Sequence, residues 1–214
     1  MILIGYSGHS YVINGILHAL GIKTTGYCDS EEKKSNPLSL KYFGKELSDT
    51  GIKALTQQDF FIATGNNTIR RNIFNNLAIR NLLPINAVHP TSTIDHTVAI
   101  ASHGVMVAAN VTINAFAKIG TGAICNTYSI IEHECEIGDF AHVGPGAVLC
   151  GNVKVGENSF IGARSVVREG IKIGKNVIVG AGSVVVKDIP DNVKVVGNPA
   201  RILEPAKIAH LKTA

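Results

Sequence analysis

Two neighbouring residues, His133 and Glu134, are the pair in this sequence best suited to moving protons. A histidine side chain ordinarily changes its charge near neutral pH, so it can take up and release a proton under working conditions. A second histidine, His142, follows nine residues later, and Gly151 lies eighteen residues after His133. These residue types indicate acid–base chemistry, provided that the fold places them at its surface.

The segment that carries these residues is built from six-residue repeats. Residues 107–190 divide into fourteen hexads without a gap, and two further hexads, led by Ile94 and Ile100, precede a one-residue slip near Met106. Thirteen of the fourteen leading residues are aliphatic and the other is Cys125, while the fifth residue is small or β-branched and glycine is frequent at the second. Such a short internal period is typical of a β-helix and lacks the 3.6-residue spacing of an α-helix.

The geometry of a β-helix accounts for each position of the hexad. One hexad makes a short strand and a corner, and three hexads close a triangular coil of about eighteen residues that buries its interior by stacking on its neighbours. We expect the leading residue to point inward, the fifth to fill the narrow interior, and Gly or Asn to adopt a left-handed backbone at the corners. His133 (third position) and His142 (sixth) should point outward, as should four aromatic residues: Phe116, Tyr128, Phe140 and Phe160.

Residues 1–88 have a different pattern, in which short apolar strands alternate with helical spacing. Strands are expected at 1–4, 24–28, 60–64 and 85–88, and helices at 11–20 and 68–78. This alternation predicts a small parallel sheet, similar to a truncated Rossmann fold. We therefore expect an α/β domain at 1–88 and an all-β, β-helical domain at 89–214 that ends in a short helix at about 200–212.

The first strand-to-helix turn, Gly5-Tyr6-Ser7-Gly8-His9-Ser10, has the composition of an anion-binding loop. Backbone N–H groups and the positive end of a helix dipole would face a phosphate there. Asp29 follows the second strand, where dinucleotide-binding folds place an acid for a ribose or base. The loop does not read GxGxxG, which argues against NAD, and a turn without any ligand is the alternative.

Composition narrows the possible partners and compartment. The net charge of +4 is spread along the chain without a basic run, which argues against nucleic acid. The start of the chain lacks the pattern of a signal peptide, and no apolar stretch approaches the ~20 residues of a membrane span. The four cysteines show no CxxC spacing, so we expect free thiols in a reducing cytoplasm.

Both halves together resemble one family. The segments that carry the resemblance are IGYSGHS, Asp29-Ser30, FIATGNNTIRRNI, AVHPTSTI, ICNTYSIIEHECEIGDFAHVGPGAVLCGNVKVG and VGNPAR. They resemble the hexapeptide-repeat acetyltransferases that act on UDP-linked 4-amino-4,6-dideoxy sugars, as in bacillosamine biosynthesis, and the related sialic acid O-acetyltransferases. The resemblance implies a left-handed parallel β-helix, a homotrimer, acetyl-CoA in grooves between neighbouring subunits and a UDP-sugar on the small domain.

The resemblance also implies roles for particular residues. His133 would be the general base and Glu134 the acid that orients it. Substrate-binding residues would be Gly8, His9, Asp29, Ser30, Gly65, Asn66, Asn126 and His142. Residues near acetyl-CoA would be Gly151, Ala163, Gly180, Ala181 and Arg201, and no metal is expected. Gly151 lies one full coil after His133, so it should stack beside it and could offer its N–H to the acetyl carbonyl.

Three alternatives remain open from the sequence. O-acetylation of sialic acid would use the same base and groove, so motifs do not separate it from N-acetylation. A protein that binds a nucleotide sugar without catalysis would keep only the small domain's function. A γ-type carbonic anhydrase shares the coil but needs three converging metal-binding histidines, and no clear third histidine follows His133 and His142.

Overall fold

The structure is a computed structural model that describes residues 1–205 of the chain. Its small N-terminal part holds the strands β1 (Ile2–Ile4), β2 (Gly26–Cys28), β3 (Lys41–Tyr42) and β4 (Phe60–Ile62), and the helices α1 (Gly8–Ala19), α2 (Asp49–Gln57) and α3 (Asn67–Ala78). The four strands run parallel in the order β3-β2-β1-β4. The predicted small parallel sheet is therefore confirmed.

Both faces of this sheet are covered because its three-residue strands are apolar throughout. Leu3 packs with α1 residues on one face, whereas Ile2 and Ile4 pack with residues of α2 and α3 on the other. The helix α1 begins at Gly8, three residues earlier than expected, since the Ser10 hydroxyl accepts the Ser7 N–H and donates to the Ser7 carbonyl. The strand β3 and the helix α2 were not predicted from the sequence.

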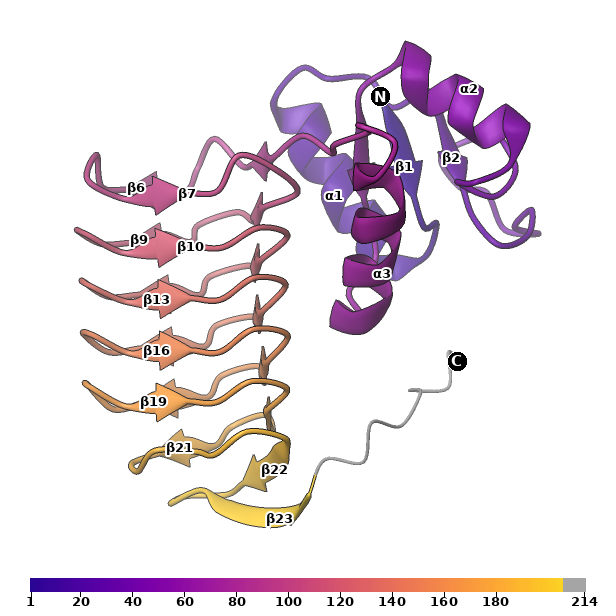
Figure 1. Cartoon of the computed structure of the whole chain (residues 1–214). Coiled ribbons are helices and arrows are strands. Elements are labelled where there is room, and N and C mark those ends of the chain that lie inside the picture. Colours follow the sequence, from indigo (N-terminus) through magenta and orange to yellow (C-terminus); the bar gives the residue numbers. More distant parts are fainter. Residues whose placement is uncertain (206–214) are drawn as a thin grey trace.

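The remaining strands wind into a parallel β-helix with three flat faces (Figure 1). The eight-stranded face contains β5 (Ala87–Val88), β8 (Met106–Val107), β11 (Ile124–Cys125), β14 (His142–Val143), β17 (Phe160–Ile161), β20 (Ile178–Val179), β22 (Val193–Val196) and β23 (Arg201–Pro205). The six-stranded face contains β6 (Thr93–Ile94), β9 (Thr112–Ile113), β12 (Ile130–Ile131), β15 (Val148–Leu149), β18 (Val166–Val167) and β21 (Val184–Val185). The five-stranded face contains β7 (Ala99–Ile100), β10 (Lys118–Ile119), β13 (Glu136–Ile137), β16 (Lys154–Val155) and β19 (Lys172–Ile173).

The strand register confirms the hexad assignment. Ile113 pairs with Ile131 and Ile131 with Leu149, eighteen residues apart, while Ile94 pairs with Ile113 across the one-residue slip. In the fourteen hexads of residues 107–190, leading residues are at most 3% exposed and fifth residues at most 9%. Each coil thus adds one layer of aliphatic side chains and one layer of small ones to a continuous core.

The left-handed backbone recurs at one fixed position of the hexad. Positive φ angles recur at the fourth residue, which Gly122 and Asn152 hold as expected for a corner, and which Tyr128 and Glu134 also hold. The second-position glycines meet a different need, which is close approach between coils. A Cβ atom on Gly156, for example, would lie 2.5 Å from the Gly174 carbonyl carbon, so only glycine fits without moving backbone.

Two expected end elements are corrected. The predicted strand at 85–88 does form at Ala87–Val88, but it pairs with β8 and belongs to the β-helix rather than to the small sheet. The predicted helix from residue 200 is wrong for its described part, because 201–205 form β23, antiparallel to β22. The chain reverses at Gly197, whose φ is +103°, and the returning strand pairs with the otherwise open edge of β22. Residues 206–212 of that expected helix lie outside the described part.

The small domain lies beside the upper coils (Figure 1). Its contact explains why one predicted outward aromatic residue is buried: Phe140 is 6% exposed because the ring of Phe74 from α3 packs edge-on against it, with centroids 5.4 Å apart. Phe116 and Tyr128 are 64% and 63% exposed, as expected for outward residues that nothing covers. The α/β domain therefore covers one patch of the β-helix surface, which includes Phe140.

Candidate active site

His133 and Glu134 occupy the corner that follows β12, between the six-stranded and five-stranded faces. We call residues 132–135 and the residues stacked on them the His133 corner. The His133 Nδ1 atom lies 3.1 Å from a Glu134 carboxylate oxygen, and the two side chains are 59% and 61% exposed. The predicted outward orientation of the pair is confirmed.

This contact determines which histidine nitrogen is open. A neutral imidazole that donates its Nδ1–H to Glu134 keeps the lone pair of Nε2 for a proton acceptor role. The left-handed backbone of Glu134, with φ of +59°, places its carboxylate beside the ring of the preceding residue. The corner therefore presents an oriented imidazole to a ligand outside the coil.

Gly151 lies directly against this imidazole. A Cβ atom on Gly151 would be 2.5 Å from both Nε2 and Cε1 of His133, so a larger residue would displace the ring. The neighbouring Asn152 N–H donates to the His133 carbonyl at 2.8 Å, which is the coil-to-coil bond that sets this stacking. The expected adjacency of Gly151 and His133 is confirmed.

A second group of predicted residues meets where the small domain covers the eight-stranded face. We call His9, Gly65, Asn126 and His142 the covered cluster. The His142 ring accepts from the Asn126 amide at 3.1 Å through Nε2 and lies 3.4 Å from the Gly65 carbonyl through Nδ1. His9 packs against Gly65, and its ring centroid is 6.2 Å from that of His142. Although His142 points out of the coil as expected, it is 6% exposed.

Burial keeps both histidines of the covered cluster neutral. Desolvation and then the nearby Arg70 charge lower the pKa of His9 to about 4 and that of His142 to about 3. His142 has partners on both nitrogens, whereas the enclosed Nε2 of His9 has no hydrogen-bond partner within the described residues. A buried polar atom without a partner is costly, so His9 Nε2 is free to bind a ligand group.

The carboxyl ends of β1 and β4 meet at the edge of the sheet that faces this cluster. The chain leaves β1 toward β2 on one side and reaches β4 on the other, which makes this pair a topological switch point, where α/β sheets bind ligands. The loop after β1 leads to Gly8 at the open first turn of α1, and the loop after β4 contains Gly65. Asn66, also a predicted ligand, uses its side-chain oxygen to cap α3 by accepting the Ile69 N–H.

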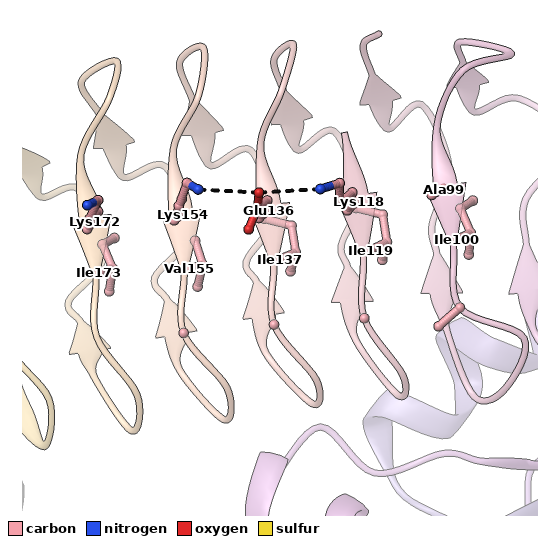
Figure 2. Close-up of a pocket in the computed structure, with 14 residues that line it drawn as sticks. Ala99, Ile100, Lys118, Ile119, Glu136, Ile137, Lys154, Val155, Lys172 and Ile173 are labelled. Atoms are coloured by element: carbon pink, nitrogen blue, oxygen red, sulfur yellow. Dashed lines mark hydrogen bonds and ion pairs between the residues drawn. The ribbon is translucent and has the colours of Figure 1, made fainter. Parts of the chain in front are cut away.

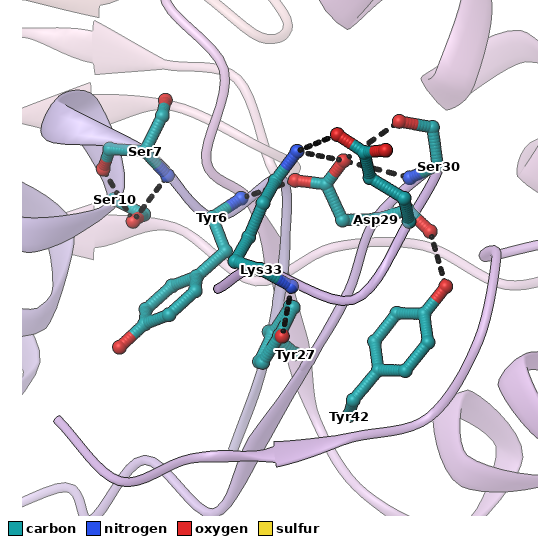
Figure 3. A network of polar contacts seen from close by, with 9 residues as sticks. Tyr6, Ser7, Ser10, Tyr27, Asp29, Ser30, Lys33 and Tyr42 are labelled. Atoms are coloured by element: carbon teal, nitrogen blue, oxygen red, sulfur yellow. Dashed lines mark hydrogen bonds and ion pairs between the residues drawn. The ribbon is translucent and has the colours of Figure 1, made fainter. Parts of the chain in front are cut away.

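Asp29 organises the loops at this edge (Figure 3). Its carboxylate accepts the Tyr6 N–H at 2.8 Å and both the N–H and the hydroxyl of Ser30, and it pairs with Lys33 Nζ at 3.2 Å. The Tyr42 hydroxyl donates to the Asp29 carbonyl. The carboxylate and Ser30 are therefore already engaged within the chain, and Lys33 is a nearby cation that the sequence did not single out.

The predicted acetyl-CoA residues do not all lie together in one chain. Ala163, Gly180 and Ala181 lie at the corner between the eight-stranded and six-stranded faces, whereas Gly151 belongs to the His133 corner. Arg201 is exposed at the start of β23 and donates to the Ala200 carbonyl. The covered cluster lies on the eight-stranded face. Within a single chain, therefore, His133 lies apart from most of the residues that are predicted to contact ligands.

Sequence reasoning missed Arg70, which lies within the segment FIATGNNTIRRNI and is almost completely buried between α3 and the coil. Its only signal was membership of that segment, because an arginine on a helix is ordinarily a surface residue.

Residues 1–205 contain no group of three or more His, Cys, Asp or Glu side chains that could hold a metal ion. The same residues include no helix long and apolar enough to cross a bilayer.

Family comparisons agree with this architecture. Residues 1–77 match the family described as the PglD N-terminal domain, and residues 152–187 match the hexapeptide repeat of succinyl-transferase. GDP-perosamine N-acetyltransferase of Escherichia coli O157:H7 is 35% identical over 117 residues, which are 53% of this chain and 52% of that protein. The match thus spans about half the length of this curated relative.

Solved structures extend the similarity over nearly the whole chain. A histidine-to-asparagine variant of perosamine N-acetyltransferase from Caulobacter crescentus, in complex with CoA and GDP-perosamine, is 34% identical with a TM-score of 0.88, over 95% of this chain and 96% of that one. The acetyltransferase domain of PglB from Neisseria gonorrhoeae, in complex with acetyl coenzyme A, is 33% identical with a TM-score of 0.85, over 94% of this chain and 98% of that one.

The β-helix of hexads together with these matches places the chain in the class of hexapeptide-repeat acyltransferases. Within that class, the chain belongs to the family of sugar N-acetyltransferases that join a PglD-type N-terminal domain to the repeats. The family resemblance stated from the sequence is confirmed.

Proposed function

We propose that this protein transfers the acetyl group of acetyl-CoA to an amino group of a nucleotide-linked sugar, with His133 as the general base. The observation that carries the proposal is the His133 corner, where an exposed imidazole is oriented by Glu134 and lies against Gly151. The family relatives act on or bind sugars of this kind, which favours N-transfer over O-transfer to sialic acid.

The reaction needs one proton to move from nitrogen to sulfur. The sugar amine attacks the thioester carbonyl, and His133 Nε2 takes the proton that the nitrogen loses as the C–N bond forms. Glu134 stabilises the imidazolium through Nδ1–H, and the Gly151 N–H is our candidate donor to the developing oxyanion. When the C–S bond breaks, the imidazolium returns the proton to the CoA thiolate, so the base is regenerated.

We propose that residues 1–88 hold the nucleotide and that 89–214 hold acetyl-CoA. Gly8, at the first turn of α1, offers backbone N–H groups to a diphosphate, and His9 Nε2, on the next residue, has no hydrogen-bond partner within residues 1–205. Asp29, Ser30, Gly65 and Asn66 shape the loops around that edge. UDP is the nucleotide we propose from the sequence resemblance; GDP is the second candidate because the Caulobacter relative was solved with GDP-perosamine.

A homotrimer would complete this site from two chains. Asn126 and His142 would contribute to the sugar pocket, and Ala163, Gly180, Ala181 and Arg201 would contact acetyl-CoA beside the His133 corner of a neighbouring subunit. The coil's faces differ in a way that supports such packing. Outward residues of the six-stranded face form an unbroken β-branched row: Thr93, Thr112, Ile130, Val148, Val166 and Val184.

The five-stranded face is charged instead, and Figure 2 shows Lys118, Glu136 and Lys154 as a ladder along it. Glu136 pairs with Lys118 at 3.6 Å and with Lys154 at 3.3 Å. Charged residues are depleted from the centres of protein interfaces, so the β-branched row is the better candidate for subunit contact.

The four cysteines, all free, fit a reducing cytoplasm, which is where we propose the reaction takes place.

An acceptor panel tests the activity directly. The purified protein of residues 1–214 is incubated with acetyl-CoA and, separately, a UDP-4-amino sugar, GDP-perosamine, sialic acid or a simple amine. Mass spectrometry should show one added acetyl group on a nucleotide-linked amino sugar only, with release of free CoA. Acetylation of sialic acid alone, or of none of these acceptors, would contradict the proposal.

Oligomeric state tests the trimer separately. Light scattering should give a mass of about three times the 22.6 kDa chain. Val148→Glu combined with Val166→Glu should dissociate the trimer and abolish activity, whereas Lys154→Glu on the charged face serves as the control and should leave both intact. A wild-type monomer at micromolar concentration would overturn the two-chain site.

A further inference from the structure

Arg70 of α3 is a buried cation without a carboxylate partner within residues 1–205. It is 1% exposed, and burial lowers its pKa to about 9. Removing a guanidinium group from water is costly, and the cost is offset only where its N–H groups find good acceptors. Its surroundings therefore need to supply a complete set of acceptors, and they do so from three separate segments.

Two of these acceptors are carbonyls of the β-helix. Arg70 Nε donates to the Gly122 carbonyl at 2.8 Å, and one terminal nitrogen donates to the Phe140 carbonyl at 2.8 Å. Gly122 and Phe140 are eighteen residues apart and hold the same corner position in consecutive coils. A rigid planar fork that spans two coils fixes α3 against the β-helix in both position and angle.

The remaining acceptors belong to the small domain itself. The same terminal nitrogen donates to the Asn67 side chain at 2.9 Å, and the other donates to the Thr64 and Gly65 carbonyls at 3.2 and 3.3 Å. The guanidinium group thus joins the loop after β4 to the coil. That loop is part of the covered cluster, since Gly65 lies against His9 and offers its carbonyl to His142.

We propose that Arg70 is a positioning residue for the nucleotide-sugar site, which it shapes by fixing residues 64–65 against the coil. This inference rests on the proposed function of the covered cluster. Arg70 does not contact the His133 corner, and it acts through the loop. Without the fork, the loop after β4 can shift relative to His142, and the nucleotide sugar binds in a poorer position while acetyl-CoA is unaffected.

The adjacent Arg71 provides a matched comparison. It also crosses between the domains, because its guanidinium pairs with Glu157 of the coil at 2.8 Å. That ion pair is partly exposed, with side chains 31% and 38% accessible, and exposed pairs contribute little. The two arginines therefore share chemistry and neighbourhood but differ in burial and in contact with the loop after β4.

Steady-state kinetics of Arg70→Lys and Arg70→Ala, with Arg71→Ala as control, test the proposal. We expect the KM for the nucleotide sugar to rise roughly 10- to 100-fold in both Arg70 variants, as for a misplaced ligand, while the KM for acetyl-CoA stays unchanged. Lysine should not restore the site because an ammonium group cannot reproduce the fork. Added guanidinium ion at low millimolar concentration should partly lower the KM in Arg70→Ala but not alter Arg71→Ala.

Hydrogen exchange provides a second readout that does not need turnover. Amides of residues 64–66 should exchange faster in Arg70→Lys than in the wild type, while amides around Gly151 should be unchanged. A folded Arg70→Lys variant with wild-type KM and wild-type exchange would overturn the proposal. If the wild type itself binds neither a UDP-sugar nor a GDP-sugar, the proposed function fails, whereas the exchange result still reports whether Arg70 fixes the loop.

Discussion

The His133 corner and the covered cluster place the same side chain in opposite surroundings. His133 is 59% exposed beside a carboxylate, whereas His142, nine residues later, is 6% exposed between an amide and a backbone carbonyl. Both point out of the coil, because both occupy outward positions of their hexads. The difference comes from the α/β domain, which lies beside the upper coils (Figure 1) and covers His142 through the loop that contains Gly65, while the side chain of His133 stays exposed.

These two environments suit different roles, proton transfer in one and ligand positioning in the other. An exposed, oriented imidazole can exchange protons with a bound amine and then with a leaving thiolate. A buried histidine with a pKa of about 3 is a neutral hydrogen-bonding group, which can position a ligand but is a poor proton acceptor. The contrast supports His133 as the base and assigns the covered cluster to recognition.

The largest expected effect is at the base. His133→Ala should lower kcat by about 10²- to 10⁴-fold, the usual loss when acid–base help is removed, with little change in affinity for either substrate. Glu134→Gln should cost less because it only orients the ring, and the double variant should cost less than the product of the two. Steady-state kinetics and calorimetry measure these effects. Full activity of His133→Ala would reverse the comparison and make His142 the next candidate.

The next effect concerns the glycine that supports the base. Gly151→Ala puts a methyl group 2.5 Å from the His133 ring, so the ring must move and kcat should fall by up to about 10²-fold. Gly15→Ala is the matched control, since nothing lies within 4 Å of its Cβ position on the exposed side of α1. That variant should keep full activity and gain helix stability. Equal kcat for Gly151→Ala and wild type would show that the ring position is not critical.

The covered cluster makes folding stability depend on pH. The pKa values of His9 and His142 fall from 6.5 to about 4 and about 3 on folding, so between those limits the unfolded chain binds more protons than the folded one. Stability from these groups is complete above pH 6.5 and is lost as the pH falls toward about 4 for His9 and about 3 for His142. Each contributes a slope of up to about 1.4 kcal/mol per pH unit. Urea unfolding from pH 7 to 4 should show a shallower slope in His142→Gln, and an unchanged slope would contradict the burial of this cluster.

The smallest effect is expected at Asp29, outside both regions. Asp29→Ala removes the acceptor of the Tyr6 and Ser30 N–H groups and the partner of Lys33, so the nucleotide loops should loosen. The Kd for the nucleotide sugar should rise by roughly threefold to tenfold, about the net contribution of one ordinary hydrogen bond, because Asp29 acts only through the loops, while acetyl-CoA binding is unchanged. Glu31→Gln, the distant and exposed second partner of Lys33, is the control. Equal affinities of Asp29→Ala and wild type in calorimetry would separate Asp29 from nucleotide binding.

The β-helix was predictable because its constraints are local and repeat. Each hexad places Ile131, Leu149 and their equivalents inward by the same six-residue rule, so the register follows from counting. The stacking of Gly151 on His133 follows from the same arithmetic. Gly and Asn hold many of the left-handed corners, as expected, but no residue type in the sequence indicated that Tyr128, Glu134 and Phe140 also adopt this backbone.

The sequence by itself determined the coil, the outward placement of His133 and His142, the strand–helix alternation of the small domain and the family resemblance. Only the tertiary structure decided that His142 and Phe140 are covered, that Ala87–Val88 joins the coil and that Arg70 is buried. The physical reason is that periodicity reports which way a side chain leaves its own element. Whether a second domain then lies over that side chain depends on contacts between residues far apart in the chain, such as Arg70 with Phe140, and no local pattern records them.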